Sequence, residues 1–166
     1  MRAKHGSVLQ YCHTPSGDGS YFPLNQIPQQ YTYGMAAYDK GATVCQALRF
    51  YLGDSLFFGG LKSFIDEYAF NDASSYDMRD HMTSFTGVDL TAFFDNFVLN
   101  SGTPHYSIDS LSVGINNKDL YDVTVFLKQK RKGPSFEGTD HIVEIMFMDE
   151  NWNMYTDTIH FQGANG

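Results

Sequence analysis

Three tyrosines stand just ahead of a lysine and a glycine in the stretch YTYGMAAYDKGATV, residues 31–44. Tyr31, Tyr33 and Tyr38 place phenol groups where a helix that serves only the core would carry leucine. A phenol has a pKa near 10, so at neutral pH it is protonated and can donate a hydrogen bond to negative charge that develops in a reaction. The same ring can also simply pack. The stretch by itself leaves both interpretations open.

The other residues that could perform catalysis or bind metal form no recognisable site. The sequence has no HExxH, GxGxxG, GxxxxGK[ST] or GxSxG pattern. No two of its six histidines are four residues apart, so none can share a metal ion on one helix face, and we expect ordinary surface or half-buried residues. Asp66 and Glu67 are adjacent acids on the polar side of an expected helix, and we interpret them as solvated rather than as an acid–base pair.

Composition narrows the classes of function. Apolar residues make up 42% of the 166 residues, enough to bury a core. The net charge of −8 argues against nucleic acid as a partner, and the basic run Lys128–Lys132 is expected to be the solvated end of a hairpin. No run of 18 apolar residues occurs, so no transmembrane segment is expected. Cys12 and Cys45 form no CxxC pair, and nothing indicates the cellular compartment.

Helical periodicity follows an irregular segment of residues 1–36 and predicts about four helices joined by short connections. The first places Gly41, Val44, Cys45, Leu48 and Leu52 on one face. Gly53 is expected to end it and Asp54 to cap the next helix. The buried stripe expected on that second helix is Leu56, Phe57, Gly60, Leu61, Phe64, Ile65 and Tyr68.

Two further helices have their own start and stop signals. Ser74 and Asp77 form a capping box, and Gly87 is expected to end the helix that follows. Asp89 is expected to cap the last helix. Its inward residues should be Leu90, Phe93, Phe94 and Phe97.

After Gly102-Thr103-Pro104 the apolar period changes to two, which predicts strands. About four are expected, at residues 106–113, 121–128, 143–148 and 154–161, with turns at INNKD, KRKGPS and DENWN. Antiparallel strands at this spacing are typical of part of a β-sandwich. We therefore expect an α+β fold, with a helical subdomain in residues 1–103 and a β-sandwich-like segment in residues 104–166.

Five short motifs in order over about 70 residues resemble the aminopeptidase N and leukotriene hydrolase family of zinc metallopeptidases, the gluzincins. They are Tyr38-Asp39-Lys40-Gly41-Ala42, Leu52-Gly53-Asp54, Phe57-Phe58 before Gly60-Leu61, Asp89-Leu90 before Phe93-Phe94, and Gly102-Thr103-Pro104. The resemblance extends from near Tyr31 to about Ile108. It implies the C-terminal helical part of a thermolysin-like catalytic domain, followed by the start of a β-sandwich domain.

The resemblance also implies roles for two tyrosines. The tyrosine of the Tyr-x-Lys-Gly motif in this family faces the catalytic zinc and donates its hydroxyl to the tetrahedral oxyanion, and here it is Tyr38. The N-terminal turn of a helix, where Tyr38 is expected, also favours an anion. Tyr33 matches a second tyrosine that lines the substrate cavity in some members. A purely packing role is the alternative for both, and Tyr31 is interpreted as structural.

The family's zinc site and its Gly-x-Met-x-Asn loop both precede this tyrosine, and neither pattern is present. We therefore expect a fragment of a zinc-dependent aminopeptidase that removes N-terminal residues from peptides. The fragment would supply Tyr38, bind no zinc, be inactive alone and associate with itself in the absence of the upstream catalytic half. The alternative is a free-standing, non-catalytic interaction module derived from the same family.

Overall fold

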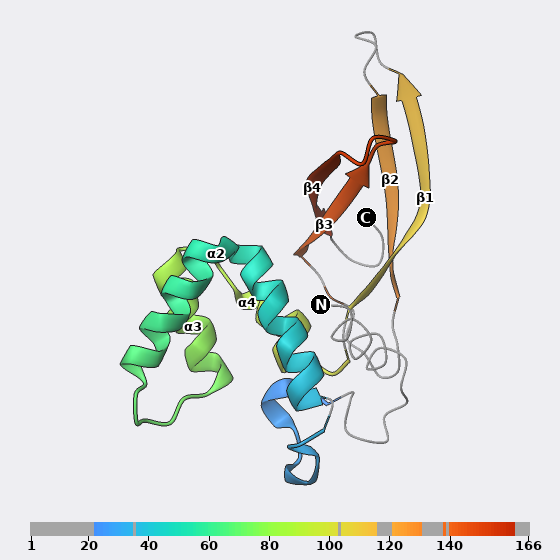
Figure 1. Cartoon of the computed structure of the whole chain (residues 1–166). Helices are drawn as coiled ribbons and strands as arrows, with labels where there is room; N and C mark the ends of the chain where they lie inside the picture. The colour runs from blue at the N-terminus through green and yellow to red at the C-terminus, as the bar shows by residue number, and fades with distance from the viewer. Residues whose placement is uncertain are drawn as a thin grey trace. The chain divides into compact units, whose positions relative to one another are not determined.

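The computed structural model describes residues 22–34, 36–102, 104–115, 121–130, 138 and 140–161. It divides into two compact units, which are Met1–Thr103 with Arg131–Phe136, and Pro104–Lys130 with Glu137–Gly166. Helices form the first unit and antiparallel strands the second, which confirms the α+β fold class (Figure 1). The assignment of the two units to a catalytic domain and a sandwich domain stays a prediction.

The helical unit begins with short turns that lead into its longest helix. Two 3-10 turns, η1 (Leu24–Gln26) and η2 (Gln29–Tyr31), lie in the segment that was expected to be irregular. Each follows a proline, whose fixed φ suits the first position of a turn. A π-helical turn, η3 (Ala36–Lys40), then continues directly into α2 (Gly41–Glu67).

Where the sequence predicted two helices, the structure has one element, α2, with a break at Gly53. Gly53 has φ 74° and ψ 162°, a conformation that is essentially restricted to glycine, and α2 bends visibly along its length (Figure 1). Asp54 was expected to act as an N-cap. Its carboxylate instead accepts two hydrogen bonds from Arg49, at 2.7 and 2.9 Å, across the break. The described residues thus contain three α-helices rather than four.

Of the next two helices, the first begins and ends as predicted. In α3 (Ser75–Thr86), the Ser74 hydroxyl accepts from the backbone N–H of Asp77, whose carboxylate accepts from the backbone N–H of Ser74. Gly87 closes the helix with φ 71°. The short α4 (Thr91–Phe94) continues as a π-helical turn, η4 (Asp95–Leu99). The prediction that Asp89 caps this helix was wrong, because the N-cap residue is Leu90, without a side-chain cap; Asp89 lies one position earlier and accepts a hydrogen bond from the N–H of Thr91 at 2.9 Å.

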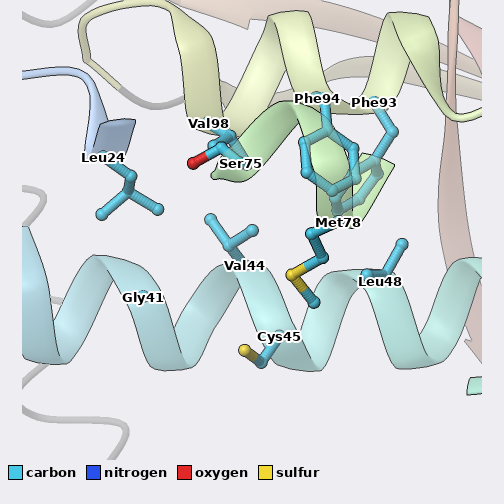
Figure 2. A pocket seen from close by; sticks show the side chains of 10 residues that line it. All are labelled: Leu24, Gly41, Val44, Cys45, Leu48, Ser75, Met78, Phe93, Phe94 and Val98. Atoms are coloured by element: carbon cyan, nitrogen blue, oxygen red, sulfur yellow. The ribbon is translucent and has the colours of Figure 1, made fainter. Parts of the chain in front are cut away.

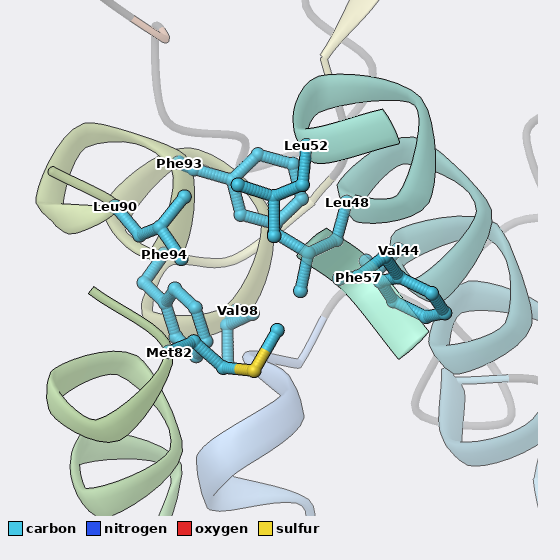
Figure 3. Packing of buried hydrophobic residues seen from close by; sticks show 9 residues of the cluster. All are labelled: Val44, Leu48, Leu52, Phe57, Met82, Leu90, Phe93, Phe94 and Val98. Atoms are coloured by element: carbon cyan, nitrogen blue, oxygen red, sulfur yellow. The ribbon is translucent and has the colours of Figure 1, made fainter. Parts of the chain in front are cut away.

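All of these helices contribute to one apolar core (Figure 3). Its buried members are Val44, Leu48, Leu52, Phe57, Met82, Leu90, Phe93, Phe94 and Val98. Gly60 lets α2 approach α3 closely, because a Cβ at that position would lie 2.8 Å from the Met82 sulfur. The expected stripes were partly wrong, since Cys45, Leu56 and Ile65 are exposed.

The strand unit consists of two antiparallel hairpins. Strand β1 (His105–Ile115) pairs with β2 (Tyr121–Lys130), and a bulge shifts the register of the pair between Ile108 and Ser110. Strand β3 (His141–Met148) pairs with β4 (Met154–Phe161). The two hairpins share a small core around Leu127, Ile145 and Phe161.

Of the expected turns, DENWN is confirmed, because the Asp149 carboxylate accepts from the N–H groups of Asn151 and Asn153 at 2.9 and 2.8 Å. Lys128 lies within β2 and not at a turn, so the expectation for the start of the basic run was wrong. The rest of that run from residue 131, KRKGPS after Lys130 and INNKD after Ile115 lie outside the described residues, as does Cys12.

Candidate functional site

Tyr38 lies on η3, the π turn that leads into α2. Its side chain is 60% exposed, and its backbone N–H donates to the Gly34 carbonyl at 3.4 Å. Within the described part of the chain, no hydrogen bond involves its hydroxyl. A π turn inside a helix is uncommon and is frequent at functional sites. Tyr38 is therefore a phenol presented to the surface from the first turn of a long helix.

The other two tyrosines of the stretch differ from each other. Tyr33 follows η2 and is 87% exposed. Tyr31 stacks on Phe22, with ring centroids 5.8 Å apart and an angle of 26° between the ring planes. This contact agrees with a structural role for Tyr31. The structure thus leaves Tyr33 and Tyr38 as the phenols available to a ligand, and it shows no contact between them among the described residues.

Lys40, two residues after Tyr38, is completely buried. Its Nζ donates to the carbonyls of Phe22 at 3.3 Å and Asn100 at 3.4 Å. Burial lowers the pKa of this lysine to about 8, because a charged ammonium is poorly solvated there. The sequence did carry a signal for this position, since Lys40, Val44 and Leu48 recur at intervals of four on one helix face. The predicted buried face included Val44 and Leu48 but not Lys40, whose charge favours exposure.

An apolar cavity of about 190 Å³ lies beside the first half of α2 (Figure 2). It is lined by Leu24, Gly41, Val44, Cys45, Leu48, Ser75, Met78, Phe93, Phe94 and Val98. Neither Tyr33 nor Tyr38 lines it, and it offers no charged group. We interpret it as a gap in the packing of the helical core, separate from the phenols.

A polar cluster separate from Lys40 lies around His81 on α3. Its Nδ1 lies 2.9 Å from the Glu67 carboxylate, and its ring packs edge-on against Phe64 and Tyr68. Asp66, the neighbour of Glu67, is paired with Lys62 and exposed. Asp66 and Glu67 thus have separate partners, and the interpretation that they are not an acid–base pair stays a prediction. The cluster joins the end of α2 to α3.

The described residues do not provide a metal site. No group of three or more histidine, cysteine, aspartate or glutamate side chains among them is close enough to hold a metal ion. Within the same residues, no helix is both long and apolar enough to cross a bilayer.

Part of the chain is similar to known proteins. Residues 23–97 match the Peptidase family M1 domain. Aminopeptidase N of Lactococcus lactis subsp. lactis is 27% identical over 123 residues, which make up 74% of this chain and 13% of that protein. Both Tyr33 and Tyr38 lie within the range matched by the family.

The fold is similar to that of a solved aminopeptidase. Legionella pneumophila aminopeptidase A, crystallised in complex with aspartic acid, superimposes with a TM-score of 0.62 at 17% identity. The likeness covers 85% of this chain and 16% of that one. The chain thus spans only a small part of the length of either relative.

Proposed function

We propose, from the match of residues 23–97 to the Peptidase family M1 domain, that the chain is part of a zinc-dependent aminopeptidase that removes N-terminal residues from peptides. The names of both relatives, aminopeptidase N and aminopeptidase A, support the reaction class. The family resemblance carries the assignment of zinc. The described residues do not fit a zinc site, so in this proposal the metal ligands belong to an upstream part of the intact enzyme.

In this proposal Tyr38 stabilises the transition state. The observation that carries it is the exposure of the Tyr38 phenol on the π turn that opens α2, at the position of the family's motif tyrosine. A protonated phenol donates a hydrogen bond to the oxyanion that forms when water attacks the scissile carbonyl. This bond strengthens as charge develops, so it lowers the barrier more than it tightens substrate binding. Tyr33, which is also exposed, would contact the substrate.

The experiment that tests the proposal begins with the reading frame upstream of Met1. An HExxH sequence in that frame, together with chelator-sensitive hydrolysis of aminoacyl substrates by the encoded protein, is the expected result. A short gene with its own ribosome-binding site and no HExxH would instead favour the non-catalytic interaction module. The 166-residue chain alone is expected to be inactive in either case.

A further inference from the structure

The burial of Lys40 is expected to lower the free energy of unfolding rather than to raise it. Its side chain is fully buried, and none of the ion pairs among described residues includes it. A buried ammonium without a counter-ion opposes folding, and an apolar side chain of similar volume would favour it. Departures of this kind from good packing chemistry are expected at functional sites.

The geometry shows what the Lys40 side chain holds together. Its Nζ donates to the Phe22 carbonyl, which lies just before η1, and to the Asn100 carbonyl, which lies at the end of η4. The η1 turn packs against both η3 and η4. Asn100 is itself held, since its side-chain amide donates to the Asp95 carbonyl at 2.8 Å. One amine therefore connects three segments that are far apart in the sequence.

We propose that Lys40 is a positioning residue for Tyr38, whose Nζ fixes the π turn against η1 and η4 so that the phenol is presented in one orientation. The inference rests on the proposed function of Tyr38. The Tyr38 hydroxyl has no hydrogen-bond partner among the described residues, so the backbone of η3 determines where it points. Lys40 ends that turn with its side chain directed into the protein, whereas Tyr38 is directed out of it.

Deprotonation does not release this connection. An ammonium has three N–H donors and a neutral amine has two, which equals the number of carbonyls that Lys40 reaches. We therefore expect the connection to persist on both sides of the lysine's pKa. Lys40 is thus a fixed brace for η3 rather than a pH switch.

A double-mutant cycle in the intact enzyme tests the inference, with Lys40→Met, Tyr38→Phe and the double variant. Lys40→Met keeps the volume and removes the donors, and we expect kcat to fall about 10- to 100-fold while KM changes little, as for a misplaced catalytic group. In the Tyr38→Phe background the same change should lower kcat by less than about threefold, because the hydroxyl to be positioned is absent. Lys62→Met, at an exposed lysine on α2, is the matched control and should leave kcat unchanged.

The outcomes separate this inference from the proposed function. If Tyr38→Phe lowers kcat but Lys40→Met does not, or if the two losses multiply, Lys40 does not act through Tyr38 and the inference is overturned. If Tyr38→Phe leaves kcat unchanged, the proposed role of Tyr38 fails, and the inference that depends on it fails too.

Should Lys40→Met not fold, the cycle is run with Lys40→Gln, which is uncharged but retains N–H donors. We then expect a smaller loss of kcat that again disappears in the Tyr38→Phe background, and losses that multiply would overturn the inference.

Amide hydrogen exchange on the 166-residue chain tests the brace without any catalytic activity. We expect Lys40→Met to accelerate exchange at least about tenfold at residues 36–40, while amides of α3 keep the rates of the parent chain. Lys62→Met should change neither set. Unaltered exchange at residues 36–40 in Lys40→Met would show that the amine does not hold η3, whatever the kinetics.

Discussion

The π turn η3 places two chemically different side chains two residues apart, one in solvent and one in the interior. Tyr38 is exposed with a free hydroxyl among the described residues, and Lys40 is buried between two carbonyls. Neither arrangement is what packing alone would select, because a phenol at the surface buries little area and an ammonium in the core is poorly solvated.

Substituting Tyr38 by Phe in the intact enzyme should lower kcat and kcat/KM by similar factors of about 100 to 1000, the range for removal of one oxyanion donor. KM should barely change, because the ground-state carbonyl gains little from the donor. Steady-state kinetics measure this, and Tyr33→Phe should give a milder loss. Stability should fall by about 1 kcal/mol at most, since the hydroxyl is exposed. A loss of activity that follows unfolding would return Tyr38 to a structural role.

The stability of the helical unit should rise with pH between about 8 and 10.5, the folded and unfolded pKa values of Lys40. In this window the unfolded chain binds the lysine proton more tightly than the folded chain does, so deprotonation favours folding. The rise should be up to about 3 kcal/mol. Urea unfolding followed by far-UV circular dichroism checks it, with Lys40→Met as the control that should lack the rise. An equal rise in that variant would assign the effect to other groups.

At the scale of elements, the bend in α2 allows one long segment to contribute to the core from two directions. Leu48 and Leu52 lie before Gly53, and Phe57 lies after it, yet all three are members of the same cluster. The Arg49–Asp54 pair spans the break, but both side chains are largely exposed, so it contributes little.

Gly53→Ala should destabilise the helical unit by about 1 to 3 kcal/mol, because the φ and ψ of Gly53 exclude a residue with a Cβ. Gly41→Ala is the matched control within the same helix. A Cβ at Gly41 meets no atom within 4 Å, so that variant should be more stable by about 0.5 to 1 kcal/mol. Denaturant unfolding of both variants measures the contrast. Equal effects at the two glycines would contradict a requirement for the bend.

At the scale of the whole molecule, the purified chain should retain no stoichiometric zinc after dialysis and should cleave no aminoacyl chromogenic substrate. The reason is that the sequence contains no paired set of zinc ligands. Metal analysis by mass spectrometry and an activity assay with added zinc measure the two properties. One tightly held zinc ion per chain would contradict the fragment interpretation.

The isolated chain should also associate with itself. Large apolar side chains are exposed on both units, including Leu56, Phe58 and Ile65 on α2 and Leu111, Val113, Ile115, Tyr121 and Val123 on the β1–β2 hairpin. Exposed apolar surface of this extent is uncommon on soluble monomers. Light scattering at increasing concentration should show oligomers. Ile65→Glu and Val113→Glu, compared separately, identify which unit is responsible, and a monomer at high concentration would contradict the prediction.

The sequence alone determined the local features of this protein, because they depend on neighbouring residues. The capping box at Ser74, the closing glycine at Gly87, the strand β4 and the turn at Asp149 were all predicted and are present. Each follows from backbone chemistry within a few positions. The family motifs likewise are short and local, and the resemblance that they carry is what distinguishes Tyr38 from Tyr31 as a candidate.

Tertiary structure decided the features that depend on residues far apart in the chain. Periodicity assigned Cys45, Leu56 and Ile65 to buried stripes, yet they are exposed, because a stripe is buried only where a partner covers it. Lys40 is the opposite case. Its charge predicts exposure, but carbonyls 18 residues before it and 60 residues after it accept its N–H donors and allow its burial. The spacing of Lys40 with Val44 and Leu48 indicates a shared face, but no local pattern identifies the two carbonyls, since these contacts exist only once the chain has folded.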